Sequence, residues 1–409
     1  MAERLSAGAV HPSRGQRPQW SAFLELGFRP LYLAGGFWAA ISIAVWVFAP
    51  SGLTGTLPGV YWHAHEMLWG FIATVAVGFL FTAGANWTGV NPVRGMALAG
   101  LVLLWGAARI GFLWPGPFAF LLAAACELAF FMFAAVALAR VIYGTRNRNN
   151  YGIPVLVLGL AMADGLYLQA ARAGDFSLLV PRFEAGLLCM AVIAMLVARR
   201  VIPFFAMRGV AGLAIPMHAV SGRWQLAAGV LAIVCLLLGW MPALAWALAV
   251  AGAIALWQGW DWKPLSVRHV PLLWILYAGY AGLGIGLLLA AAHAAGWGMR
   301  AAWPVHAIGV AGFAVLIIGM VTRTALGHLG RPMRTDRSMV IAYGLVIAAA
   351  LLRLAALFPS GWSSFALQAS AGAWIIAFTL YVGRFFPWLI RPRADSPGVT
   401  PAGRPAGRS

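Results

Sequence analysis

Residues 62–85 read WHAHEMLWGFIATVAVGFLFTAGA, in which two histidines, a glutamate and a methionine open an apolar run long enough to enter a membrane. Ionisable side chains cost roughly 2 to 3 kcal/mol or more in a hydrocarbon layer unless another group pairs with them, so they mark candidate functional sites. Imidazole is a common metal ligand, and coordination of a metal ion or a haem iron offsets that cost. This stretch therefore predicts an integral membrane metalloprotein.

The composition indicates a membrane protein over the whole chain. Of the 409 residues, 62% are hydrophobic, 9% are charged and 20 are tryptophan, and the mean hydropathy is +0.85. A chain this apolar cannot bury its surface in one water-soluble core. The net charge of +18 does not indicate nucleic-acid binding, because the basic residues lie between apolar runs and not on one soluble face. The expected partner is the lipid bilayer.

Apolar windows of about 20 residues predict an all-α polytopic fold with about 12 transmembrane helices. The predicted spans are residues 31–48, 63–85, 95–113, 118–142, 153–171, 183–206, 224–239, 242–258, 270–293, 302–322, 338–358 and 363–386. Arginine-bearing connectors alternate with short connectors that are nearly uncharged. By the positive-inside rule, both termini are cytoplasmic and the histidines at the start of the second span face the outer side.

A single membrane domain accounts for most of the chain. We expect a polar cytoplasmic N-terminal segment at residues 1–27, one transmembrane helical domain at 28–390 and a disordered cytoplasmic tail at 391–409, which is rich in Pro, Gly, Ser and Arg. The three cysteines stand alone in apolar runs without CxxC spacing, so no disulfide is predicted.

His63 and His65 have neighbours that metal chemistry could use. A separation of two residues on a regular α-helix means about 200° of rotation, so the two side chains cannot reach one metal and should have different partners. His63 and Met67 share a helix face, and an imidazole with a thioether is a soft ligand pair suited to Cu(I). A packing role for Met67 is equally compatible with the pattern.

His65 is expected to bind haem as an axial ligand, with His306 of the tenth span at similar depth as its companion. Gly309 and Gly312 follow His306, where they either give room to a flat macrocycle or serve helix packing. Arg300 is close enough in sequence to pair with a haem propionate.

The other ionisable residues divide into lone histidines and a charged network. His328 is a further candidate haem or metal ligand near the inner face, whereas lone histidines at span ends are expected to be interfacial.

Four charged residues fall at comparable depth in the outer half of different spans: Arg109, Glu127, Asp164 and Arg353. Glu127 or Asp164 is expected to pair with Arg109 or Arg353, and the network is either structural or a proton path.

Five motifs in order along the chain resemble the NnrS family. They are FRP at residues 28–30, HAHEMLWGF at 63–71, GFL at 78–80 with NWTG at 86–89, RVIPFF at 200–205, and GMVTR at 319–323 with HLGRP at 328–332. The resemblance implies a bacterial inner-membrane protein that contains haem b and copper and is linked to nitric oxide metabolism and nitrosative stress during denitrification.

The resemblance also bears on the ligands. It supports four histidines as candidates without assigning each to a cofactor: His63, His65, His306 and His328. Many members of the family carry a His where this chain has Tyr277. If that His is a ligand, this protein lacks one site or binds its cofactor differently.

Two classes of function are compatible with these observations. The favoured one is a haem and copper protein that protects against nitric oxide, either by binding it at a His-ligated haem or by limiting nitrosylation of iron centres. The alternative is a twelve-helix secondary transporter of a small solute or metal. The sequence does not indicate whether the protein is an enzyme.

Overall fold

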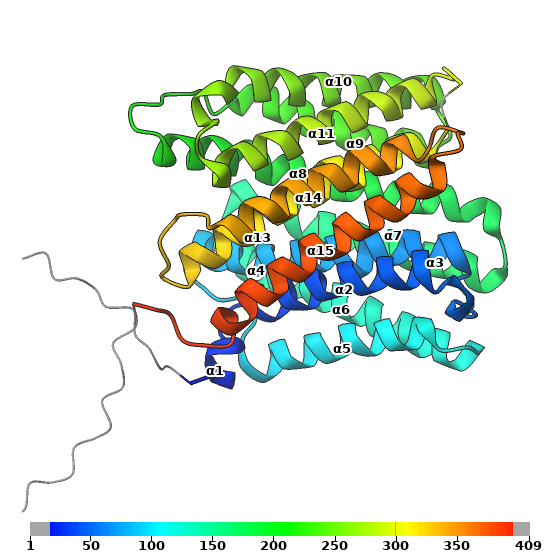
Figure 1. The fold of residues 1–409 in the computed structure, drawn as a ribbon, viewed down its shortest axis with the longest axis horizontal. Helices are drawn as coiled ribbons and strands as arrows, with labels where there is room; N and C mark the ends of the chain where they lie inside the picture. Colours follow the sequence, from blue (N-terminus) through cyan, green and yellow to red (C-terminus); the bar gives the residue numbers. More distant parts are fainter. Residues whose placement is uncertain (1–16, 299, 396–409) are drawn as a thin grey trace, which may run out of the picture.

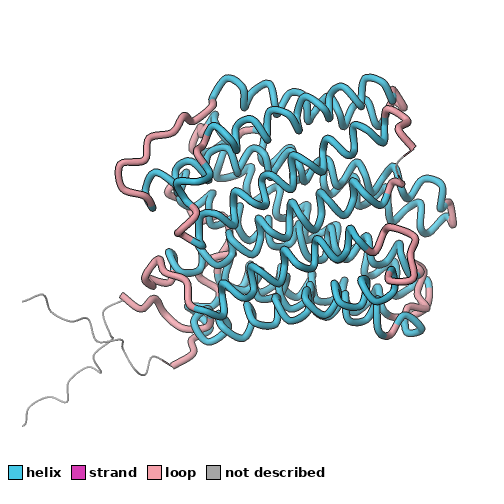
Figure 2. The backbone as a smooth tube through the Cα atoms, turned by 45° about the horizontal axis from the view of Figure 1, so that its top comes forward, coloured by secondary structure: helices cyan, strands magenta, loops and turns pink. Residues whose placement is uncertain are grey.

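The molecule is a bundle of membrane-length helices. The computed structural model describes residues 17–298 and 300–395, and the regular secondary structure in this part of the chain is helical (Figures 1 and 2). Within the described residues, 12 helices are long and apolar enough to cross a membrane. The predicted all-α polytopic fold is confirmed, and the chain is a multi-pass membrane protein.

The first six spans come from the first half of the chain. They are α2 (Phe28–Phe48), a composite second span of α3 (Gly59–His65), η2 (Glu66–Ala73) and α4 (Thr74–Thr88), then α5 (Gly95–Leu113), α6 (Pro117–Gly144), η3 (Arg148–Asn150) with α7 (Gly152–Ala173), and α8 (Phe176–Gly209). Two short helices, α1 (Trp20–Phe23) and η1 (Pro50–Gly52), flank the first span.

The last six spans come from the second half of the chain. They are α9 (Ala219–Leu237), α10 (Met241–Asp261), α11 (Pro271–Ala294), a composite tenth span of α12 (Ala302–His306), η5 (Ala307–Ala314) and α13 (Val315–His328), then α14 (Arg337–Ala355) and α15 (Ser363–Leu389). The short helix η4 (Pro264–Val267) lies between α10 and α11.

The bundle has two ends, and the connecting loops gather at them (Figure 2). We call the end that carries α1 and the C-terminus of α15 the terminal end (Figure 1). The opposite end, where α3 begins, is the distal end. The backbone N–H of Gln19 donates to the carbonyl of Ile390 over 2.9 Å, so both described ends of the chain meet. This arrangement follows from an even number of spans. That the terminal end faces the cytoplasm stays a prediction.

The observed helices extend beyond several predicted spans. The sixth begins at Phe176 and the tenth continues to His328, although polar residues such as Arg182 and Arg323 interrupt the apolar pattern there. A helix continues past such residues because its backbone groups need their hydrogen bonds even where the side chains are polar.

Glycines of α11 bring the ninth span against the tenth. A Cβ atom at Gly286 would lie 2.7 Å from the backbone nitrogen of Ile308, and one at Gly282 would collide with the backbone of Ala311. Close backbone approach through small residues is a common way to pack membrane helices. These glycines therefore determine how near η5 lies to α11.

Two spans contain a wide π-helical segment, η2 in the second and η5 in the tenth. Each segment starts directly after a histidine, His65 or His306. Such segments are rare and concentrate at functional sites, because the wider turn changes which way the following side chains point.

The predicted terminal segments lie only partly within the described residues. Of the segment 391–409, residues 391–395 are described, and the N–H of Ala394 donates to the carbonyl of Leu329 over 3.0 Å. Residues 396–409, like 1–16, lie outside the described part, so the predicted disorder of the tail remains a prediction.

Candidate functional site

Two candidate sites lie in the distal half of the bundle, and each contains one histidine of the second span. His65 lies in a group of buried charges that we call the charge cluster: His65, Glu66, Arg109, Glu127 and Asp164. His63 lines a partly open space that we call the distal cavity. The two histidines thus have different partners, as their spacing of two residues implies.

The charge cluster is centred on the imidazole of His65. Its Nδ1 lies 3.0 Å from Oε1 of Glu66, and its Nε2 lies 3.1 Å from Oδ1 of Asp164 and 3.2 Å from Oε2 of Glu127. All of these side chains are 2% exposed or less. Donor atoms of His65, Glu127 and Asp164 lie within 4.8 Å of one another, so this group could hold a metal ion.

Arg109 bridges two of the carboxylates. Its Nη1 lies 2.5 Å from Oε2 of Glu66, and its Nη2 donates to Oε1 of Glu127. The indole Nε1 of Trp38 donates to the same Glu66 oxygen over 2.6 Å. A Cβ atom at Gly70 would collide with the Arg109 guanidinium, so only glycine leaves room for this bridge. The predicted pairing of Glu127 with Arg109 is confirmed, whereas Asp164 pairs with His65.

The distal cavity has a volume of about 360 Å³ and is mainly apolar. A few groups that can bind metals or charges reach it from four spans: His63, Met67, Glu184, His306 and Arg353. An apolar pocket with a small number of convergent polar groups is the usual form of a small-molecule or cofactor site.

The two histidines of the distal cavity, His63 and His306, differ in the partners of their ring nitrogens. Nδ1 of His306 lies 2.7 Å from the carbonyl of Ala302, and because a carbonyl can only accept, Nδ1 carries the proton and Nε2 keeps its lone pair. A backbone partner of this kind is typical of histidines that bind metals. The ring of His63 stacks on Trp46 at 3.9 Å and 11°, and its buried Nδ1 has no hydrogen-bond partner among the described residues.

The glycines after His306 have separate roles. A Cβ atom at Gly309, which lines the distal cavity, would meet nothing within 4 Å. A Cβ atom at Gly312 would lie 3.0 Å from the Cα of Leu283. Gly309 therefore leaves open space, and Gly312 serves helix packing.

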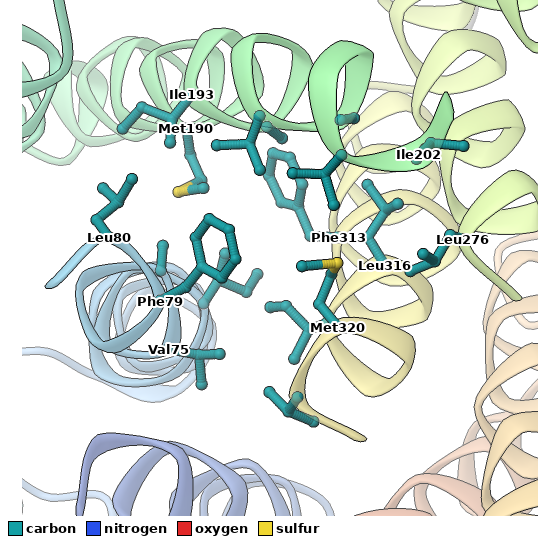
Figure 3. Close-up of a pocket in the computed structure, with 18 of the residues that line it drawn as sticks. Val75, Phe79, Leu80, Met190, Ile193, Ile202, Leu276, Phe313, Leu316 and Met320 are labelled. Carbon is teal, nitrogen blue, oxygen red and sulfur yellow. The ribbon is translucent and has the colours of Figure 1, made fainter. Parts of the chain in front are cut away.

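A smaller apolar cavity of about 80 Å³ lies deeper in the bundle (Figure 3). Phe79, Met190, Phe313 and Met320 are among the side chains that line it, and they come from three different spans. Ile72 lines both this apolar cavity and the distal cavity, so the two spaces adjoin along the second span.

Three other residues that the sequence singled out are not part of either site. Nε2 of His328 lies 3.4 Å from Nδ2 of Asn86 near the terminal end. The hydroxyl of Tyr277 donates to the carbonyl of Trp262 over 3.0 Å. Arg300 is exposed and donates to the carbonyl of Leu357 over 3.4 Å.

The structure brings some predicted ligands together and separates others. His63, Met67 and His306 line one cavity, but His65 does not share it, because both of its ring nitrogens face carboxylates. Arg353 was expected in the charged network and lies instead at the cavity, with Cζ 5.9 Å from the Trp46 ring centroid.

These features define the class of protein: a polytopic helical membrane protein with a buried His/Glu/Asp group that could hold a metal. The NnrS protein family matches residues 22–393, nearly the whole chain, and the chain belongs to this family. No curated protein matches it.

Proposed function

We propose that this protein holds haem b and copper in the bacterial inner membrane and protects against nitrosative stress by binding nitric oxide at the distal cavity. The observation that carries the proposal is the convergence of two imidazoles, His63 and His306, from different spans on one mainly apolar cavity. Membership in the NnrS family supports the cofactor classes that the sequence motifs imply.

His306 is the proposed axial ligand of the haem. Its Nδ1–H is occupied by the carbonyl of Ala302, which orients the ring and leaves Nε2 as the coordinating atom. Gly309 leaves room beside it for a flat macrocycle. Arg353 lines the same cavity and can pair with a propionate, a role that the sequence suggested for Arg300.

His63 and Met67 are the proposed copper ligands. Both residues line the distal cavity. The buried Nδ1 of His63 has no hydrogen-bond partner among the described residues, so it is free to bind a metal. An imidazole with a thioether is a soft donor set that favours Cu(I).

This assignment leaves the haem iron with one protein ligand. His65, the second ligand expected from the sequence, is held by carboxylates in the charge cluster. A haem held by His306 would supply the iron at which nitric oxide could bind. The apolar cavity that adjoins at Ile72 could admit nitric oxide to the distal cavity, since apolar cavities accept small apolar molecules.

Optical spectroscopy of the purified full-length protein tests the proposal. The wild type should show a Soret band that shifts on reduction and again on addition of nitric oxide. His306→Ala should lose the Soret band, whereas His269→Ala, which removes an exposed histidine at the terminal end, should keep it. A folded wild type without haem, or a His306→Ala variant with an unchanged spectrum, would contradict the proposal.

A further inference from the structure

The charge cluster lies outside the proposed haem and copper cavity and has a charge imbalance of its own. Four spans contribute to it: His65 and Glu66 from the second, Arg109 from the third, Glu127 from the fourth and Asp164 from the fifth. The cluster holds three carboxyl groups and one guanidinium, so with the carboxylates ionised it carries a charge of −2 when His65 is neutral and −1 when His65 is protonated. A net charge in a buried site is costly unless another charge balances it.

The hydrogen bonds of the cluster are also incomplete. Nε2 of His65 can hold one proton but faces two carboxylate oxygens, Oδ1 of Asp164 and Oε2 of Glu127. Oε2 of Glu127 and Oδ2 of Asp164 are buried and have no hydrogen-bond partner among the described residues. Lone pairs of three side chains thus converge on one point, to which Nε2 can contribute only one proton.

We propose that His65 Nε2, Glu127 and Asp164 bind one divalent metal cation. A charge of +2 balances the cluster to zero with His65 neutral, and it gives the unpaired Oε2 of Glu127 a partner. The Nε2–oxygen separations of 3.1 and 3.2 Å are those of neighbouring ligands around a metal with bonds of about 2.0–2.2 Å.

The remaining residues of the cluster orient the ligands. With Nε2 on the metal, the proton of His65 resides on Nδ1 and is donated to Glu66 Oε1, the carboxylate–histidine–metal arrangement of many metalloproteins. Arg109 and Trp38 hold the other oxygen of Glu66. Glu66 is therefore a positioning residue for His65.

The donor set indicates which kind of cation binds. One imidazole and two carboxylates suit a divalent ion of intermediate hardness, such as Zn²⁺, Mn²⁺ or Fe²⁺, and give no soft sulfur ligand for Cu(I). This site is thus chemically distinct from the His63 and Met67 pair at the distal cavity.

Metal analysis of the purified full-length protein tests the proposal. After treatment with a chelator, the wild type should take up about one Zn²⁺ or Mn²⁺ per chain and gain thermal stability on doing so. Asp164→Asn should lose this uptake, whereas Asp175→Asn, which removes an exposed carboxylate at the same end of the bundle, should retain it. Glu66→Gln should weaken binding by about 10- to 100-fold without abolishing it.

Several outcomes would overturn the site. These are a folded, chelator-treated wild type that takes up neither ion, an Asp164→Asn protein that binds like the wild type, or a bound ion that is lost in His63→Ala and kept in Asp164→Asn. If Asp164→Asn does not fold, X-ray absorption of the Zn²⁺-loaded wild type decides, since sulfur in the coordination shell would exclude the cluster. The Soret band reports on His306 separately, so failure here leaves the proposed function independently testable.

Discussion

At the residue scale, neighbouring side chains in the second span enter different chemical environments. His65 is fully buried among carboxylates, whereas His63 stacks on Trp46 at the edge of a mainly apolar cavity. The carboxylates around His65 favour a cation or a proton there, and the cavity beside His63 favours a soft or apolar ligand. One short motif therefore supplies ligands for two unlike sites.

Replacement of His63 distinguishes these environments. We expect His63→Ala to reduce the copper content to background while the Soret band persists, because His306 and not His63 is the proposed haem ligand. Copper and haem are measured together by metal analysis and absorption spectroscopy. Met67→Leu, which conserves apolar volume, should also lower copper. If copper persists in Met67→Leu, Met67 is a packing residue.

At the scale of elements, the tenth span is held in place by backbone contact. Gly282 and Gly286 of α11 allow η5 to approach so closely that a single methyl group would meet the backbone of the neighbouring segment. The π-helical segment η5 begins after His306, so this contact also determines where the His306 ring lies relative to the second span.

Substitution of Gly282 should therefore disturb both stability and cofactor binding. We expect Gly282→Ala to destabilise the protein by about 1–3 kcal/mol, since the added methyl group overpacks a close contact, and to reduce haem retention. Thermal unfolding in detergent and the Soret absorbance measure the two effects.

Gly344→Ala is the matched control. It is also a glycine within a helix, but a Cβ atom there would meet nothing within 4 Å. We expect this change to be neutral or to stabilise by up to about 1 kcal/mol, because alanine has the higher helix propensity. Equal effects of the two substitutions would show that close packing against η5 is unimportant.

At the scale of the whole molecule, the two ends of the bundle differ in character. The terminal end joins the first and last spans through Arg29, whose Nη1 donates to the carbonyls of Leu389 over 3.1 Å and Arg391 over 2.6 Å. The charge cluster and the distal cavity both lie toward the opposite end. The orientation of the protein thus decides which compartment supplies ligands to these sites.

Reporter fusions test the orientation. A reporter that is active only in the periplasm should be active after Gly59 or Gly116, which lie at the distal end, and inactive after Asn147 or Arg393 at the terminal end. A cytoplasmic fluorescent reporter should give the complementary pattern. The opposite result would place the terminal end outside.

The number and approximate position of the spans in the described part of the chain follow from the sequence, because a bilayer requires about 20 apolar residues per helix. The observed pairing of Glu127 with Arg109 was one of several pairings that the sequence predicted, since buried charges need partners. The packing of the helices, in contrast, is what brings His306 to one cavity with His63 and Arg353 and places His65 against Glu127 and Asp164. Such pairings depend on how each helix is rotated and packed. A prediction of which side chains share a helix face assumes a regular rotation of about 100° per residue. The wide turns of η2 and η5 depart from this rotation.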